Sequence, residues 1–236
     1  MEQMTNRITE SEQTHICPPF GNAVLCEGTG NLLELFAGSR SVGRVAESFG
    51  VKVFSVDWQK FEGIDLAIDI GELKKEDVPF VPDIVWASPD CTTYTIAAIS
   101  THRNGTEPKS DYAKKCDAVN QHFISLISEW LAINPVMVFF IENPRGMLRK
   151  MPFMQEFKRH TIWYCQYGDD RAKPTDVWTN SEDWTPRPQC KNGNPNCHHQ
   201  PAPRGSKTGT QGRKGSYERS IIPHELCLEV LSSACG

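Results

Sequence analysis

Short apolar runs alternate with helical patterns along most of this chain, and this alternation limits the possible folds more than any other feature. Residues 42–49 and 111–133 repeat apolar side chains at helical spacing. The apolar runs between them are typical of buried strands and cover 31–36, 51–56, 82–87, 136–141 and 161–166. Strands that alternate with helices predict βαβ units, and so a Rossmann-like α/β fold with a mostly parallel sheet flanked by helices.

The composition along the chain divides it into a core, a small insert and two flanking segments. The length of 236 residues suits one such core, expected over 31–180, after a polar lead-in at 1–30. Residues 181–216 are rich in Pro, Gly, Asn, Lys and Arg and are expected to form a small basic Cys/His insert. Residues 217–236 return to a helical pattern that would complete the core.

Cysteine content and hydropathy indicate the compartment. The nine cysteines are an odd number and are scattered, which favours a reducing compartment in which thiols serve catalysis or metal binding. The longest strongly apolar run, 135–141, is too short for a membrane span, and the N-terminus lacks the apolar centre of a signal peptide. We therefore expect a cytoplasmic protein that is neither secreted nor membrane-bound.

The charge of the chain is unevenly distributed. A formal net charge of −4 argues on its face against a nucleic-acid-binding protein. Between 186 and 219, however, the chain has only one acidic residue and seven basic ones, Arg187, Lys191, Arg204, Lys207, Arg213, Lys214 and Arg219. A basic segment on an acidic body can bind phosphates, although a solvated loop explains the same composition.

Residues able to bind or react follow the predicted strands one after another. In a parallel sheet, ligands bind at the carboxyl ends of the strands. A structural role such as a helix cap or a core position explains any one of these residues alone, whereas their order along the chain indicates a site. In that order they are the glycine turn at 36–39, Asp57-Trp58, Asp69-Ile70, Ser88 to Cys91, Glu142, and the cations Arg171 and Lys173.

In this order the residues resemble the motifs of the cytosine-C5 DNA methyltransferases, over roughly 31–180 and 217–231. The resemblance implies the class I fold of S-adenosylmethionine-dependent methyltransferases. It also implies that S-adenosylmethionine binds to Phe36, Ala37, Gly38, Ser39, Asp57, Trp58, Asp69, Ile70, Ser88, Pro89 and Ser220.

The same resemblance implies the catalytic residues. Cys91 would be the nucleophile that adds to C6 of cytosine, and Glu142 would stabilise the adduct around N3 and the exocyclic amine. Arg171 and Lys173 would hold the substrate phosphate or the base carbonyl. The sequence departs from the family in that Arg40 stands where a glycine is usual and Asp90 separates Pro89 from the cysteine.

The insert replaces the large target-recognition domain of the family and has two features of its own. Cys190, Cys197 and one of the two adjacent histidines, for which we take His198, supply three zinc ligands, with Cys165 as the expected fourth. A loop with incidental Cys and His residues is the alternative. The basic residues Arg204, Lys207, Arg213 and Lys214 are expected to contact DNA phosphates.

The function expected from the resemblance is S-adenosylmethionine-dependent methylation of C5 of cytosine in DNA, with duplex DNA as the substrate. The missing recognition domain leaves open the same chemistry on RNA or on a free pyrimidine nucleotide. The Asp90 insertion leaves open a catalytically inactive, methyltransferase-like protein that binds DNA. Nothing in the sequence indicates an oligomeric state.

Overall fold

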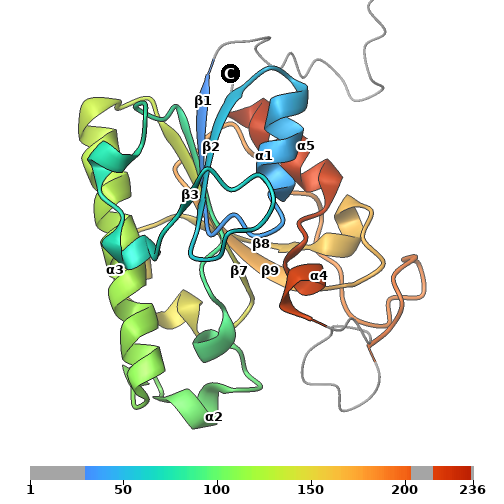
Figure 1. Cartoon of the computed structure of the whole chain (residues 1–236). Helices are drawn as coiled ribbons and strands as arrows, with labels where there is room; N and C mark the ends of the chain where they lie inside the picture. Colours follow the sequence, from blue (N-terminus) through green and yellow to red (C-terminus); the bar gives the residue numbers. More distant parts are fainter. Residues whose placement is uncertain (1–29, 203–214, 235–236) are drawn as a thin grey trace, which may run out of the picture.

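The chain folds around one twisted sheet of seven strands in the order β3-β2-β1-β4-β7-β9-β8 (Figure 1). The computed structural model describes residues 30–202 and 215–234. Neighbouring strands from β3 to β7 run parallel, whereas β9 runs antiparallel to both β7 and β8. The strands are β1 Asn31–Leu35, β2 Lys52–Asp57, β3 Leu66–Ala67, β4 Ile84–Ala87, β7 Val138–Pro144, β8 Arg159–Trp163 and β9 Pro174–Thr179.

Helices cover both faces of the sheet. The long helix α3 packs on one face, and α1 and α5 pack side by side on the other (Figure 1). No helix within the described ranges is both long and apolar enough to cross a bilayer. The helices are α1 Ser41–Ser48, α2 Ile99–His102, α3 Asp111–Ile133, α4 Ser216–Ser220 and α5 His224–Ser233; β5 Arg103–Asn104 and β6 Glu107–Pro108 form a small separate hairpin.

Two hydrophobic clusters, one on each face, hold these layers together. Alternate residues of β1 belong to different clusters: Leu33 packs with α3, and Leu32 packs with α1 and α5. Short 3-10 helices occupy many of the connections: η1 Ile70–Glu72, η2 Lys75–Asp77, η3 Thr92–Tyr94, η4 Leu148–Lys150, η5 Pro152–Met154 and η6 Tyr164–Tyr167. This layered, mostly parallel architecture confirms the predicted Rossmann-like α/β fold.

The sequence did not predict β9, which lies between β7 and β8 in the sheet. Its residues Pro174 and Asp176 are unusual in strands, so local propensity argues against one. The structure accommodates Asp176 because the guanidinium of Arg149 forms an ion pair with its buried carboxylate. The expected strand at 161–166 is also shifted, since β8 ends at Trp163 and η6 follows it.

The strand order changes direction between β1 and β4, and in sheets of this kind ligands bind beyond the carboxyl ends of the strands at such a point. The turn after β1 and the segment after β4 therefore meet at the same edge of the sheet. β7, which continues through Glu142 rather than ending before it, extends to the same edge.

A buried ion pair fastens the segment after β4 to α3. Arg103 Nη2 lies 2.6 Å from Asp117 Oδ1, and Nη1 lies 3.0 Å from Oδ2. The Tyr94 hydroxyl donates to the same Oδ1 at 2.6 Å, and Arg103 Nε donates to the Thr93 carbonyl at 3.0 Å. The residues that directly follow Cys91 are thereby anchored in the core.

Candidate functional site

The turn after β1 is held in place by the carboxylate at the end of β2. The Gly38 N–H donates to Asp57 Oδ2 at 3.0 Å, and the Gln59 N–H donates to Asp57 Oδ1 at 2.9 Å. Burial raises the pKa of Asp57, and these backbone hydrogen bonds oppose that rise. The backbone of the turn is left-handed at Phe36 (φ +55°) and Gly38 (φ +46°), a conformation typical of ligand-binding turns.

Arg40 keeps the left-handed conformation for which the related motif uses glycine. Its φ is +53°, and such a conformation costs a side-chain-bearing residue roughly 1–3 kcal/mol. Its guanidinium compensates by donating to Ser55 Oγ at 2.9 Å and by forming an ion pair with Glu47. These two contacts therefore hold Arg40 in the left-handed conformation of the turn.

Glu34, which the sequence analysis missed, supports the turn from inside the fold. It is 2% exposed and accepts hydrogen bonds from the Val42 N–H and the Ser55 hydroxyl, each at 3.2 Å. Burial raises its pKa to about 7. Its position inside an otherwise apolar strand was the only available sequence signal.

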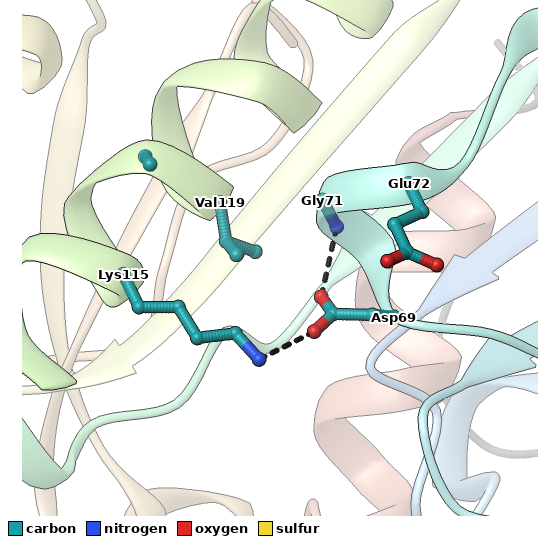
Figure 2. A pocket seen from close by; sticks show the side chains of 6 residues that line it. Asp69, Gly71, Glu72, Lys115 and Val119 are labelled. Carbon is teal, nitrogen blue, oxygen red and sulfur yellow. Dashed lines mark hydrogen bonds and ion pairs between the residues drawn. The ribbon is translucent and has the colours of Figure 1, made fainter.

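A second group of predicted cofactor residues lies beyond β2 and β3. The Trp58 side chain is 67% exposed, so one of its faces is accessible for stacking. Asp69 Oδ1 accepts the Gly71 N–H at 3.0 Å, and Oδ2 lies 2.6 Å from Lys115 Nζ, as Figure 2 shows. Lys115, which the sequence did not indicate, lowers the pKa of Asp69 through this contact.

A pocket of about 270 Å³ adjoins this pair and is lined by Asp69, Gly71, Glu72, Lys115, Ala118 and Val119 (Figure 2). Ile70 is 2% exposed and packs in the core beneath this pocket, so it is not among the residues that line the pocket.

The remaining cofactor candidates lie close to the first turn or to the end of β4. Ser88 Oγ accepts a hydrogen bond from Trp86 Nε1 at 2.8 Å. A Cβ atom placed on Gly38 would lie 3.8 Å from Ser220 Oγ, and the Ile222 N–H donates to Ser41 Oγ at 3.1 Å. The C-terminal segment thus reaches the glycine turn, as the resemblance implied.

Glu142 and Lys173 form a charged pair at the carboxyl edge of the sheet. Lys173 Nζ lies 3.8 Å from Glu142 Oε1, and the Tyr164 hydroxyl donates to that oxygen at 2.8 Å. Lys173 Nζ also lies 4.2 Å above the Tyr164 ring, and burial lowers the pKa of the lysine. Tyr164 was missed by the sequence analysis because its partner comes from a distant strand.

Cys91 is half-buried and lies within electrostatic reach of this pair. Burial raises the pKa of its thiol to about 11; Asp90 and Glu142 raise it further, whereas Lys173 lowers it. The Asn143 amide donates to the Pro89 carbonyl at 2.8 Å and so ties the cysteine segment to β7. With the extra residue before it, the thiol still lies within electrostatic reach of Glu142 and Lys173.

Asp90 itself has a local structural role. Its Oδ1 accepts the Thr92 N–H at 2.6 Å, and its Oδ2 accepts a hydrogen bond from the Tyr112 hydroxyl.

Arg171, the other predicted cation, lies in a buried ion pair close to Lys173 in the chain. Arg171 is 1% exposed, and its guanidinium is paired with Asp169 through Nε–Oδ1 at 2.8 Å and Nη2–Oδ2 at 2.5 Å. Its Nη1 lies 3.4 Å from the Arg219 carbonyl oxygen, so it joins the turn to the C-terminal segment. Lys173 is the cation that faces Glu142.

Replacing Lys173 with methionine is expected to slow the alkylation of Cys91 at pH 8, because Lys173 lowers the pKa of this thiol. Arg171→Met should instead lower the free energy of unfolding by about 3–5 kcal/mol, since it leaves a buried carboxylate without its partner. Peptide-resolved alkylation rates and urea unfolding distinguish the two effects. Equal alkylation rates in Lys173→Met and the unmodified protein would show that Lys173 does not influence the Cys91 thiol.

The four residues of the Cys/His cluster are Cys165, Cys190, Cys197 and His199. One ligand atom from each lies within 4.8 Å of all the others. The expected histidine ligand, His198, is wrong: its side chain is exposed and its Nε2 lies 3.0 Å from the Asp169 carbonyl oxygen. The predicted DNA-contacting residues Arg204, Lys207, Arg213 and Lys214 lie outside the described residues.

No family model and no curated protein matches the chain. It is similar to the solved structure of the Entamoeba histolytica methyltransferase EhMeth, with 15% identity and a TM-score of 0.49 over 69% of this chain and 57% of that one. It is also similar to the S. pombe Dnmt2 methyltransferase, with 14% identity and a TM-score of 0.43 over 66% and 52% of the two chains. A mutant of Spodoptera frugiperda DNMT2 shows 17% identity and a TM-score of 0.45 over 73% and 57%. The chain spans slightly more than half the length of these structures.

Proposed function

We propose that the protein transfers a methyl group from S-adenosylmethionine to C5 of cytosine in DNA. The observation that carries this proposal is the meeting of Cys91, Glu142 and Lys173 at one edge of the sheet. A thiol, a carboxyl group and a cation are the groups needed to add to a pyrimidine ring and to balance the charge that develops on it.

The residues at the neighbouring strand ends fit a nucleoside cofactor. The Asp57 carboxylate can accept hydrogen bonds from ribose hydroxyls, and the exposed Trp58 ring can stack on adenine. Asp69 is an acceptor for the adenine amine, and Ser220 closes the opposite end next to Gly38. S-adenosylmethionine, when bound there, would supply an electrophilic methyl group.

Cys91 begins the reaction by adding to C6 of the base. The thiol loses its proton, the sulfur–C6 bond forms, and the ring electrons that shift away from C6 make C5 nucleophilic. Lys173 favours the thiolate because it lowers the pKa of Cys91. C5 would then bond to the methyl carbon while the methyl–sulfur bond of S-adenosylmethionine breaks, with S-adenosylhomocysteine as the leaving group. Transfer of the C5 proton to a base would then re-form the C5–C6 double bond and release the Cys91 thiolate.

Glu142 would face the polar edge of the cytosine. Its carboxyl group would hold the proton at N3 and accept a hydrogen bond from the exocyclic amine, which offsets the charge that Cys91 introduces. The Tyr164 hydroxyl fixes the orientation of this carboxyl group through Oε1. A positioned acid or base of this kind contributes about 10²–10⁴-fold.

Glu142→Gln should therefore slow methyl transfer at least about a hundredfold while leaving the affinity for S-adenosylmethionine unchanged. Single-turnover assays and cofactor titration measure the two quantities. Glu182→Gln is a matched control because the side chain of Glu182 is 84% exposed. Parallel losses in cofactor affinity and rate would show that Glu142 supports the cofactor site instead.

We propose duplex DNA as the substrate because the basic segment that contains Arg204, Lys207, Arg213 and Lys214 can neutralise its phosphates. The target cytosine would have to leave the stack, at a cost of a few kcal/mol.

The test of the proposed function offers labelled S-adenosylmethionine with duplex DNA, RNA or free cytidine nucleotides, followed by mass spectrometry of the nucleosides. The expected product is 5-methylcytosine in DNA. If only RNA or only free nucleotides became methylated, that class, and not DNA, would be the substrate. No product, together with no covalent adduct on DNA that contains 5-fluorocytosine, would favour an inactive binding protein.

A further inference from the structure

Three thiols and one imidazole converge away from the cysteine–carboxyl–lysine site. Cys165 comes from η6, whereas Cys190, Cys197 and His199 come from the loop that follows β9. All four ligand atoms lie within 4.8 Å of one another, and Cys190 Sγ lies 3.8 Å from His199 Nδ1. Three of the four side chains are at most 8% exposed, namely Cys165, Cys190 and His199.

The loop around this cluster has little regular secondary structure and only a small hydrophobic core to order it. Between β9 and residue 202 the chain contains no helix or strand, although it keeps a defined course. The hydrophobic cluster around these thiols is small and adds Trp163 and Ala172 to Cys165, Cys190 and Cys197. A polar loop without a core of its own is typical of segments that a bound metal orders.

The spacing of the four side chains suits one tetrahedral ion. Zinc–sulfur bonds of about 2.3 Å place tetrahedral sulfur ligands about 3.8 Å apart, a separation within the range seen in this cluster. A disulfide would use only two of the three thiols, and all three cysteines are free in the structure. Three thiolates and one imidazole form a common zinc ligand set.

We propose that Cys165, Cys190, Cys197 and His199 bind one Zn²⁺ ion in a closed structural site. Four protein ligands leave no position for water or substrate, so the ion would stabilise the fold without taking part in chemistry. Ligation through His199 Nδ1 would place the ring proton on Nε2. The Gly193 N–H, which now lies 3.2 Å from Nε2, would then have to turn away.

The metal would also position the cation of the active site, an extension that rests on the proposed function. Cys165 directly follows Tyr164, whose hydroxyl holds Glu142, and the same segment continues to Lys173. The loop is joined to this segment a second time, because the Gln200 N–H donates to the Asp170 carbonyl at 2.9 Å. The ion and this hydrogen bond would therefore together fasten the loop to the segment that carries Tyr164 and Lys173.

Two adjacent histidines provide the decisive test. After the full-length chain is purified with Zn²⁺ and dialysed, we expect about one zinc per chain by mass spectrometry of the metal. His199→Ala and Cys190→Ser should lose most of this zinc, and His198→Ala should retain it. Zinc well below one equivalent in the unmodified protein, or equal loss in His198→Ala and His199→Ala, would overturn the proposal.

A second measurement on the unmodified protein avoids variants that fold poorly. Co²⁺ in place of Zn²⁺ should give the intense visible absorption of a tetrahedral thiolate site, and spectra of octahedral, oxygen-bound Co²⁺ would contradict the site. Neither metal measurement involves methyl transfer, so the zinc proposal and the proposed function can fail separately.

The positioning role has its own measurement. Removal of zinc by a chelator should slow the alkylation of Cys91, followed on its own peptide, because Lys173 would no longer lower the pKa of the thiol. An unchanged Cys91 rate after complete zinc removal would restrict the ion to stabilising the loop.

Discussion

Cys91→Ser is expected to reduce methyl transfer by at least about a thousandfold while sparing the binding of S-adenosylmethionine. The substitution removes the thiol that is proposed to form the bond to C6, and a serine hydroxyl is a far weaker nucleophile. Asp57 and Trp58, which would hold the cofactor, lie at the end of β2, whereas Cys91 follows β4, so the substitution does not alter them. Single-turnover transfer to duplex DNA and cofactor titration measure the two effects.

Cys116→Ser is the matched control for this variant, since Cys116 lies in α3 and takes no part in the proposed reaction. It should retain transfer and should still form a covalent adduct with DNA that contains 5-fluorocytosine. Cys91→Ser should form none. Adduct formation by Cys91→Ser would assign the nucleophile to another thiol.

The pH dependence of Cys91 follows from the same chemistry. Because burial raises the pKa of the thiol to about 11, the reactive thiolate is a minor species at neutral pH. Its fraction grows as the pH rises toward that value, so alkylation of Cys91 in the free protein should accelerate about tenfold per pH unit between about pH 7 and 10.

Asp117→Ala is expected to lower the free energy of unfolding by about 3–5 kcal/mol. The substitution leaves the guanidinium of Arg103, whose side chain is fully buried, without its counter-charge, and the Tyr94 hydroxyl loses its acceptor. Urea unfolding followed by circular dichroism measures the change. Because Thr93 and Tyr94 directly follow Cys91, transfer should also fall.

An exposed ion pair on the same helix is the control. Asp111 and Lys114 are 99% and 60% exposed, and Asp111→Ala should change stability by no more than about 1 kcal/mol. The double variant Arg103→Met/Asp117→Leu should recover part of the lost stability, since it removes both charges together. A double variant less stable than Asp117→Ala would show that packing around Arg103, not its charge, dominates.

The sequence predicted those parts of the fold that depend on local signals. The apolar run of β1 and the glycine turn after it lie next to each other in the chain, so their pattern is visible directly. Cys91, Glu142 and Lys173 could be singled out for the same reason, because each follows a strand or a turn that the sequence predicts. The left-handed backbone at Arg40 could not be predicted, because an arginine gives no signal for it.

Features that depend on tertiary contacts could not be predicted. The two histidines at 198 and 199 have identical local chemistry, and only the course of the loop brings His199 toward the thiols. Arg171 and Lys173 both follow η6, and only the position of Asp169 decides which of them faces Glu142. Strand β9 carries a proline and an aspartate that only its neighbours make acceptable.

The antiparallel pairing of β7 with β9 fixes the positions of two of the proposed reacting groups, Glu142 and Lys173, relative to each other. Glu142 pairs in register with Val177, and Lys173 directly precedes β9, so a ladder of main-chain hydrogen bonds maintains the separation of carboxyl group and cation. Cys91 lies outside any strand, between the end of β4 and η3. The sheet itself thus fixes the carboxyl–lysine pair, whereas Cys91 is held by side-chain hydrogen bonds to the residues around it, from Asn143 to Pro89 and from Arg103 to Thr93.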